Sequence, residues 1–129
     1  MKQDLINRII NAALAEADNL KIAITISLVD LGGHLTALRR TENGSFFGIE
    51  VSKKKAITAS QLKMPTHVLA DIGQKIPDLQ KAFDKDLNIL TLAGGFPIVI
   101  DGVLVGGLGI SGGDFNQDKT IGEKALQAI

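Results

Sequence analysis

Two histidines, His34 and His67, are the side chains of this sequence best suited to hold a metal ion. A neutral imidazole nitrogen is a common metal ligand near neutral pH. His34 stands in a predicted strand directly after a pair of glycines, and His67 opens a predicted helix after Pro65 and Thr66. No histidine pair has the spacing of a zinc site, and the absence of cysteine excludes thiolate zinc sites, disulfides and cysteine nucleophiles. Either histidine could equally be an ordinary surface or core residue.

Lys53, Lys54 and Lys55 form a basic run inside a predicted helix. Consecutive helical residues point in directions about 100° apart, so the three ammonium groups cannot all face one partner. We expect Lys53 and Lys54 to be solvated. Lys55 lies nearer the packed side of the helix, where it could reach a carboxylate or a propionate.

The residues from Gly107 to Gly112 read GLGISG, which matches the G-x-G-x-x-G pattern of dinucleotide sites. That site also needs a second parallel strand and a later acidic residue, and too few residues follow Gly112 to supply them. We expect the glycines to let a helix or a ligand approach the strand closely. A weaker alternative is an anion held by the N–H groups of Gly112, Gly113 and Asp114 at a helix start.

The composition is that of an ordinary globular domain. The 129 residues are 45% hydrophobic and 22% charged, which predicts one domain over residues 1–129. Fourteen basic residues balance fourteen acidic ones, so nothing favours nucleic acid as a partner. The first residues lack the apolar core of a signal peptide, and the apolar stretch 90–113 is too rich in glycine for a membrane helix. We therefore expect a cytoplasmic protein that does not enter a membrane.

Two predicted hairpins decide the fold class. A strand over 21–30, with Ile24, Ile26 and Leu28 on one apolar face, turns at 30–33 into a partner strand over 34–40. Asp101 and Gly102 lie between two apolar runs, which is a strong signal for a second tight hairpin. Both hairpins require antiparallel pairing.

Hydrophobic periodicity predicts helices and strands in the order α-β-β-α-α-β-β-β-α. Besides the first hairpin, helices are expected over 4–19, 46–62, 67–75 and 114–128, with a further turn of helix near 79–83, and strands over 87–93, 96–100 and 103–110. The predicted class is α+β, with a five-stranded antiparallel sheet and packed helices.

Several segments taken together resemble the GlcG/HbpS haem-binding family, which includes the C-terminal domain of PduO-type proteins. They are VDLGGHLTALRR, Ser45, KKAITAS, AGGFPIVIDGVLVGGLGISGG and Asp118, in matching order and spacing over nearly the whole chain. One departure is Gly122, where the family more often has alanine, and this glycine should weaken the last helix. The resemblance implies a bacterial protein that forms an even-numbered homo-oligomer, up to an octamer. Some members of the family bind haem, so haem is the cofactor that the resemblance implies.

The resemblance also implies candidate ligand residues. Thr66 matches an oxygen ligand, His67 beside it is the better iron ligand by its chemistry, and Met64 is a softer alternative. His34 is a second candidate ligand, and Lys55 is the candidate partner of a propionate. Family glycines that line turns near the pocket match Gly94, Gly95, Gly112 and Gly113. Which of His67, His34, Thr66 or Met64 would ligate iron stays open.

Three functions are compatible with these residues. The first is a binding module for haem or a related tetrapyrrole. The second is an enzyme or enzyme accessory that acts on a small anionic metabolite, and the third is an oligomeric scaffold. Whether the protein is an enzyme stays open. The chain is apolar for its size, so we expect other subunits to cover part of its surface.

Overall fold

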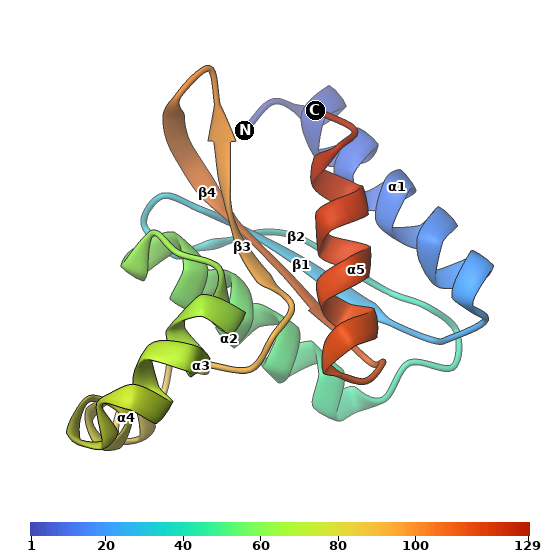
Figure 1. Ribbon diagram of the computed structural model, residues 1–129. Helices are drawn as coiled ribbons and strands as arrows, with labels where there is room; N and C mark the ends of the chain where they lie inside the picture. The colour runs from blue at the N-terminus through green and yellow to red at the C-terminus, as the bar shows by residue number, and fades with distance from the viewer.

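A computed structural model describes all residues from 1 to 129 and shows a four-stranded sheet between two helical layers (Figure 1). The elements follow the order α1 (Gln3–Leu20), β1 (Thr25–Asp30), β2 (Leu35–Arg40), α2 (Phe46–Leu62), α3 (Thr66–Lys75), α4 (Pro77–Asp84), β3 (Gly95–Ile100), β4 (Val103–Ser111) and α5 (Phe115–Leu126). The strands lie in the order β2-β1-β4-β3, and every neighbouring pair is antiparallel. Helices α1 and α5 cover one face, and α2 covers the other.

The prediction of five strands is wrong, because residues 87–93 form no strand. Side chains, not a neighbouring strand, accept hydrogen bonds from two of the backbone donors of this segment. The Leu90 N–H donates to Thr58 Oγ1 at 2.8 Å, and the Asn88 N–H donates to Asp86 Oδ1 at 2.8 Å. No strand lies beside this segment, and Leu87 is 83% exposed. The α+β class and the antiparallel pairing are as expected, and the predicted turn of helix near 79–83 belongs to a full helix, α4.

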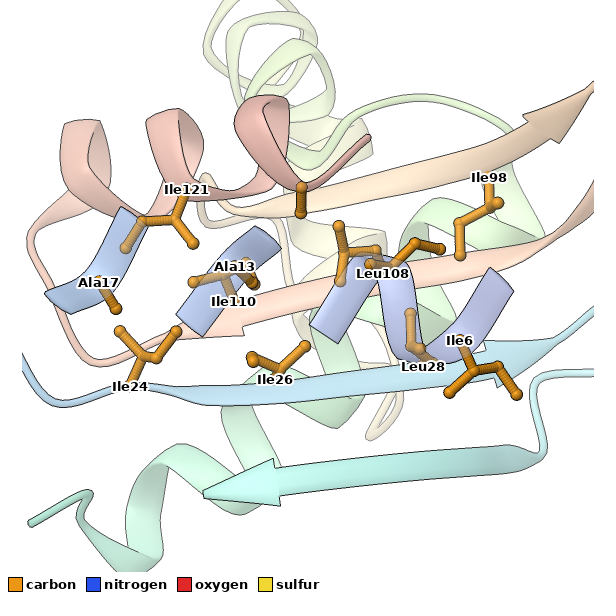
Figure 2. Packing of buried hydrophobic residues seen from close by; sticks show 12 residues of the cluster. Ile6, Ala13, Ala17, Ile24, Ile26, Leu28, Ile98, Leu108, Ile110 and Ile121 are labelled. Carbon is orange, nitrogen blue, oxygen red and sulfur yellow. The ribbon is translucent and has the colours of Figure 1, made fainter. Parts of the chain in front are cut away.

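One face of the sheet carries the hydrophobic core. The alternation in β1 turns Ile26 and Leu28 toward α1 and α5, as predicted. The core cluster that Figure 2 shows consists of Ile6, Ile9, Ala13, Ala17, Ile24, Ile26, Leu28, Ile98, Leu108, Ile110, Ile121 and Ala125. All its members are aliphatic, so this layer holds no group that could react.

The opposite face is built from small and polar residues, and α2 packs on it at close range. A Cβ placed on Gly107 or Gly109 would collide with the carbonyl oxygens of Ala56 and Ser52 in α2. Beside them, Ser27 Oγ of β1 and Ser52 Oγ lie 2.8 Å apart and share a hydrogen bond. The expectation that these glycines let a helix approach the strand is therefore confirmed.

The second hairpin has the tight turn that its sequence predicts. Asp101 and Gly102 adopt φ values of 50° and 79°, so both central residues are in the left-handed region. This is the turn geometry that matches the twist of paired strands, and it favours glycine at the second position. The tip of the β3–β4 hairpin extends beyond the helices (Figure 1). No helix of this fold is both long and apolar enough to cross a membrane.

Candidate functional site

A buried ion pair joins the two helical layers at the start of β3. Lys55, from the middle of α2, is 1% exposed, and Asp118, from the first turns of α5, is 2% exposed. Lys55 Nζ donates to Asp118 Oδ2 at 3.0 Å. Asp118 Oδ1 accepts a second hydrogen bond, from the Gly113 N–H at 2.8 Å. Each carboxylate oxygen therefore has a donor.

The Lys55 ammonium also completes the edge of the sheet. The pairing of β3 with β4 begins at Gly95 and Gly109, so the last residues of β4 pair with β1 on one side and have no strand on the other. There the Ile110 N–H donates to the Gly94 oxygen at 2.9 Å, and Lys55 Nζ donates to the Ile110 oxygen at 2.7 Å. The lysine thus supplies a donor where a longer β3 would have supplied a backbone N–H.

Burial dominates the electrostatics of this pair. Burial lowers the pKa of Lys55, and the nearby Asp118 carboxylate opposes that change. Burial likewise raises the pKa of Asp118, against the effect of the Lys55 ammonium. Both groups are enclosed and bonded within the fold, so this arrangement holds structure together and offers no open face to a substrate. The sequence singled out both residues but carried no signal that they pair.

Thr66 lies beside the ion pair and is fully buried. Its Oγ1 accepts a hydrogen bond from the Gly95 N–H at 2.8 Å and lies 3.4 Å from the Gly95 oxygen. The hydroxyl therefore ties the start of α3 to the first residue of β3. Gly94 and Gly95, two of the predicted pocket glycines, therefore lie where α2, α3 and the sheet meet.

In the loop before α5, side chains of the protein accept hydrogen bonds from the backbone N–H groups. The Gly113 N–H is bonded to Asp118, and the Asp114 N–H donates to Gln117 Oε1 at 2.9 Å. Asp114 Oδ1 in turn accepts from the Gln117 N–H at 2.8 Å, which completes a capping box. Gly112 packs against the Ala23 oxygen. Two of the three donors of the predicted anion site are thus occupied by side chains of the protein.

His67 differs from the other candidates because its ring has a buried atom without a partner. It stands in the first turn of α3, and its ring centroid lies 5.8 Å from that of Phe96 in β3. The Nδ1 atom is buried and makes no hydrogen bond. Burial, followed by the charge of Lys119, lowers the pKa of His67, and the carboxylates of Glu123 and Asp71 oppose this. The lowered pKa favours the neutral form of the imidazole near neutral pH.

The fold does not bring the other candidates to His67. His34 lies in the turn between β1 and β2, at one edge of the sheet, whereas His67 contacts β3 at the other edge. The His34 side chain is 82% exposed, and its Nδ1 lies 3.2 Å from Asp30 Oδ1. Met64 is partly exposed in the turn between α2 and α3, three residues before His67 in the chain. No group of three or more His, Asp or Glu side chains in the fold is arranged to hold a metal ion.

Comparison with known proteins supports the family resemblance that the sequence motifs indicated. Residues 1–127 match the family model described as "Haem degrading protein HbpS-like". The chain belongs to the HbpS-like family. Protein GlcG of Escherichia coli is 30% identical over 111 residues, which cover 86% of this chain and 81% of GlcG. The family resemblance inferred from the sequence is therefore confirmed.

Other members of the HbpS-like family differ in length. The corrinoid adenosyltransferase PduO of Salmonella typhimurium is 35% identical over 126 residues, which cover 96% of this chain but only 37% of PduO. Among solved structures, a PduOC:heme complex superimposes with a TM-score of 0.91 and 32% identity, and the match covers 100% of this chain and 94% of that chain. The chain therefore spans little more than a third of the PduO protein that it matches.

Proposed function

We propose that this chain is a binding module for haem or a related tetrapyrrole, and that His67 is the axial ligand of the iron. The observation that carries the proposal is the ring of His67, which has a buried Nδ1 without any hydrogen-bond partner. A buried polar atom without a partner is uncommon in folded proteins and needs an explanation. The similarity to a PduOC domain that was crystallised with haem gives the ligand class.

The chemistry of His67 fits an iron porphyrin. Histidine is a frequent axial ligand of haem iron, and it must be neutral to donate its lone pair. Burial and Lys119 keep the imidazole neutral by lowering its pKa. The aromatic ring of Phe96 stands beside the imidazole at a tilt of 57° and gives the site an apolar wall.

The remaining candidates have other partners in the fold. The Lys55 ammonium is held by Asp118 and the Ile110 oxygen, and the Thr66 hydroxyl is held by Gly95. We therefore do not include them among the groups that contact the porphyrin. An iron porphyrin bound at His67 would supply a redox-active iron whose potential depends on its axial ligand. The protein residues would position the iron and exclude water on one side.

The test is a titration of the full chain with haemin, followed at the Soret band. The protein contains no Trp or Tyr, so the ultraviolet spectrum is dominated by the porphyrin. We expect saturable binding that His67→Ala removes or alters. His34→Ala is the matched control, because His34 is exposed at the other edge of the sheet. Competition with albumin separates a specific site from haemin adhering to apolar surface. Binding that does not saturate, or that His67→Ala leaves unchanged, would overturn the proposal.

A further inference from the structure

A groove lies between the first turns of α1 and the far end of the β3–β4 hairpin. Its volume is about 470 Å³, within the range of small-molecule sites. The side chains of Leu5, Ile100 and Val105 are half-buried and line it, together with Met1. These four side chains are apolar, so the groove offers an apolar surface to a ligand.

Charged side chains stand at the rim of this groove. Lys2, Asp4 and Arg8 complete its lining, and all three are exposed. Neither Lys2 nor Arg8 makes an ion pair in the structure. Lys2, Arg8 and the terminal amino group of Met1 are cationic and Asp4 is anionic, so positive charges outnumber the negative one among the lining residues. A ligand that matches both parts of the groove has an apolar chain and a negatively charged head.

We propose that this groove binds an unbranched aliphatic monocarboxylate, with the chain against Leu5, Ile100 and Val105 and the carboxylate at Arg8. An arginine guanidinium fits a carboxylate because it can donate two parallel hydrogen bonds. The side chains of the lining include no uncharged hydrogen-bonding group, which disfavours a ligand with many hydroxyl groups.

The groove is separate from the haem site proposed above. His67 contacts Phe96, near the beginning of β3, whereas Ile100 is the last residue of that strand. The groove is also remote from the most exposed aromatic side chains. Phe46 and Phe47 begin α2 next to Gly48, which packs on Ser111 at the other end of β4. A ligand in the groove therefore competes neither with haem at His67 nor with a partner at the phenylalanines.

The experiment titrates the full chain with octanoate, decanoate and dodecanoate below their micelle concentrations, followed by calorimetry. We expect the affinity to rise about fourfold with each added methylene, which corresponds to about 0.8 kcal/mol per buried CH₂. Decanol, which has the same chain without the charge, should bind at least several-fold more weakly than decanoate. Equal affinity for the three acids, or for decanol and decanoate, would overturn the assignment.

Matched variants locate the carboxylate. Arg8→Gln should weaken decanoate binding about three- to tenfold, within the range of about 0.5–1.5 kcal/mol expected for losing one ordinary hydrogen bond. Arg39→Gln is the control, because Arg39 is an exposed arginine on β2, away from the groove. If Arg8→Gln and Arg39→Gln have the same effect, the carboxylate does not bind at Arg8. If decanoate fails to bind and Leu5→Lys changes the mass seen by light scattering, the groove is an interface with a second copy, and the proposal is wrong.

Discussion

Lys55 Nζ and Asp118 Oδ2 lie 3.0 Å apart in the interior of the protein and connect helices on opposite faces of the sheet. The lysine comes from α2 and reaches past the first residues of β3 to a carboxylate of α5. Because β3 begins too late to cover the end of β4, the space beside Ile110 is open to a side chain. The pair therefore closes a gap that the sheet itself leaves.

Removing one partner of this pair should be costly. We expect Lys55→Met to lower the free energy of unfolding by about 3–5 kcal/mol, because it leaves a buried carboxylate without its cation. Combining it with Asp118→Asn, which removes the charge, should recover part of the loss. Lys54→Met, at the neighbouring helical position, should change stability by less than about 0.5 kcal/mol. Urea unfolding measures all four proteins, and a double variant no better than Lys55→Met would argue against a coupled pair.

The titration of His67 should make stability depend on pH. Its pKa is lowered in the folded protein from an ordinary value of 6.5. Between the folded pKa and 6.5 the unfolded chain binds more protons, so stability falls as the pH falls through this window. Asp118, whose pKa is raised above 3.8, acts with the opposite sign at lower pH but is present in both proteins compared.

The measurement compares wild type with His67→Gln by urea unfolding at a series of pH values. The difference in free energy of unfolding should be constant above pH 6.5 and should change below it, in the direction that disfavours the wild type. Haemin affinity should decline over the same acid range, because the proton and the iron compete for the imidazole. A pH-independent difference would mean that His67 does not titrate differently in the folded state.

Gly122 makes room for the aromatic ring beside His67. A Cβ at this position would collide with the ring of Phe96. Gly122→Ala should therefore destabilise the protein by about 1–3 kcal/mol, although alanine favours a helix. Phe96→Leu in the same chain should relieve the collision and make Gly122→Ala neutral or stabilising. Thermal unfolding of the two single variants and the double variant gives the coupling, and additive effects would contradict it.

The turn at the tip of the β3–β4 hairpin offers a matched pair of substitutions. Gly102 has a φ of 79°, which a β-branched residue adopts only under strain. Gly102→Val should cost about 1–3 kcal/mol. Gly102→Asn should cost clearly less, because asparagine tolerates the left-handed region. A Cβ here meets no other atom within 4 Å, so a difference between the variants reports on the backbone and not on packing.

Self-association is expected from the exposed aromatic side chains. Phe46, Phe47 and Phe115 are 85%, 68% and 60% exposed, although phenylalanine usually contributes to a core or an interface. We expect light scattering to show an even-numbered homo-oligomer at micromolar concentration. Replacing Phe46 and Phe47 by serine should shift the mass toward the monomer. Leu87→Ser, at another exposed apolar position, is the control, and a monomeric wild type would contradict the expectation.

The sequence predicted the elements well where periodicity and turns were strong. The alternation of Ile24, Ile26 and Leu28 and the pair Asp101-Gly102 both report local geometry, and the structure agrees with them. The stretch 87–93 has the composition of a strand, but strand formation depends on a neighbour, and here Thr58 bonds the Leu90 N–H instead. Composition alone carries no information about that competition.

The candidate site was less predictable because it depends on contacts between distant residues. The place of Lys55 on the helix indicated that it could reach a carboxylate or a propionate, but which group it meets depends on how α5 packs. Likewise, nothing local distinguished His67 from His34. Only the packing of α3 against β3 buries the Nδ1 atom of one imidazole and leaves the other ring in solvent.

The close contact of α2 with β4 has a consequence for how the family can vary. The depth of α2 is set by main-chain oxygens of Ser52 and Ala56 resting on Gly107 and Gly109. Side chains in the α1–α5 layer can therefore be exchanged over evolutionary time without moving α2. His67 follows α2 after a short turn, so its position depends on the backbone contacts of α2. Substitutions in the core should therefore leave the position of His67 unchanged.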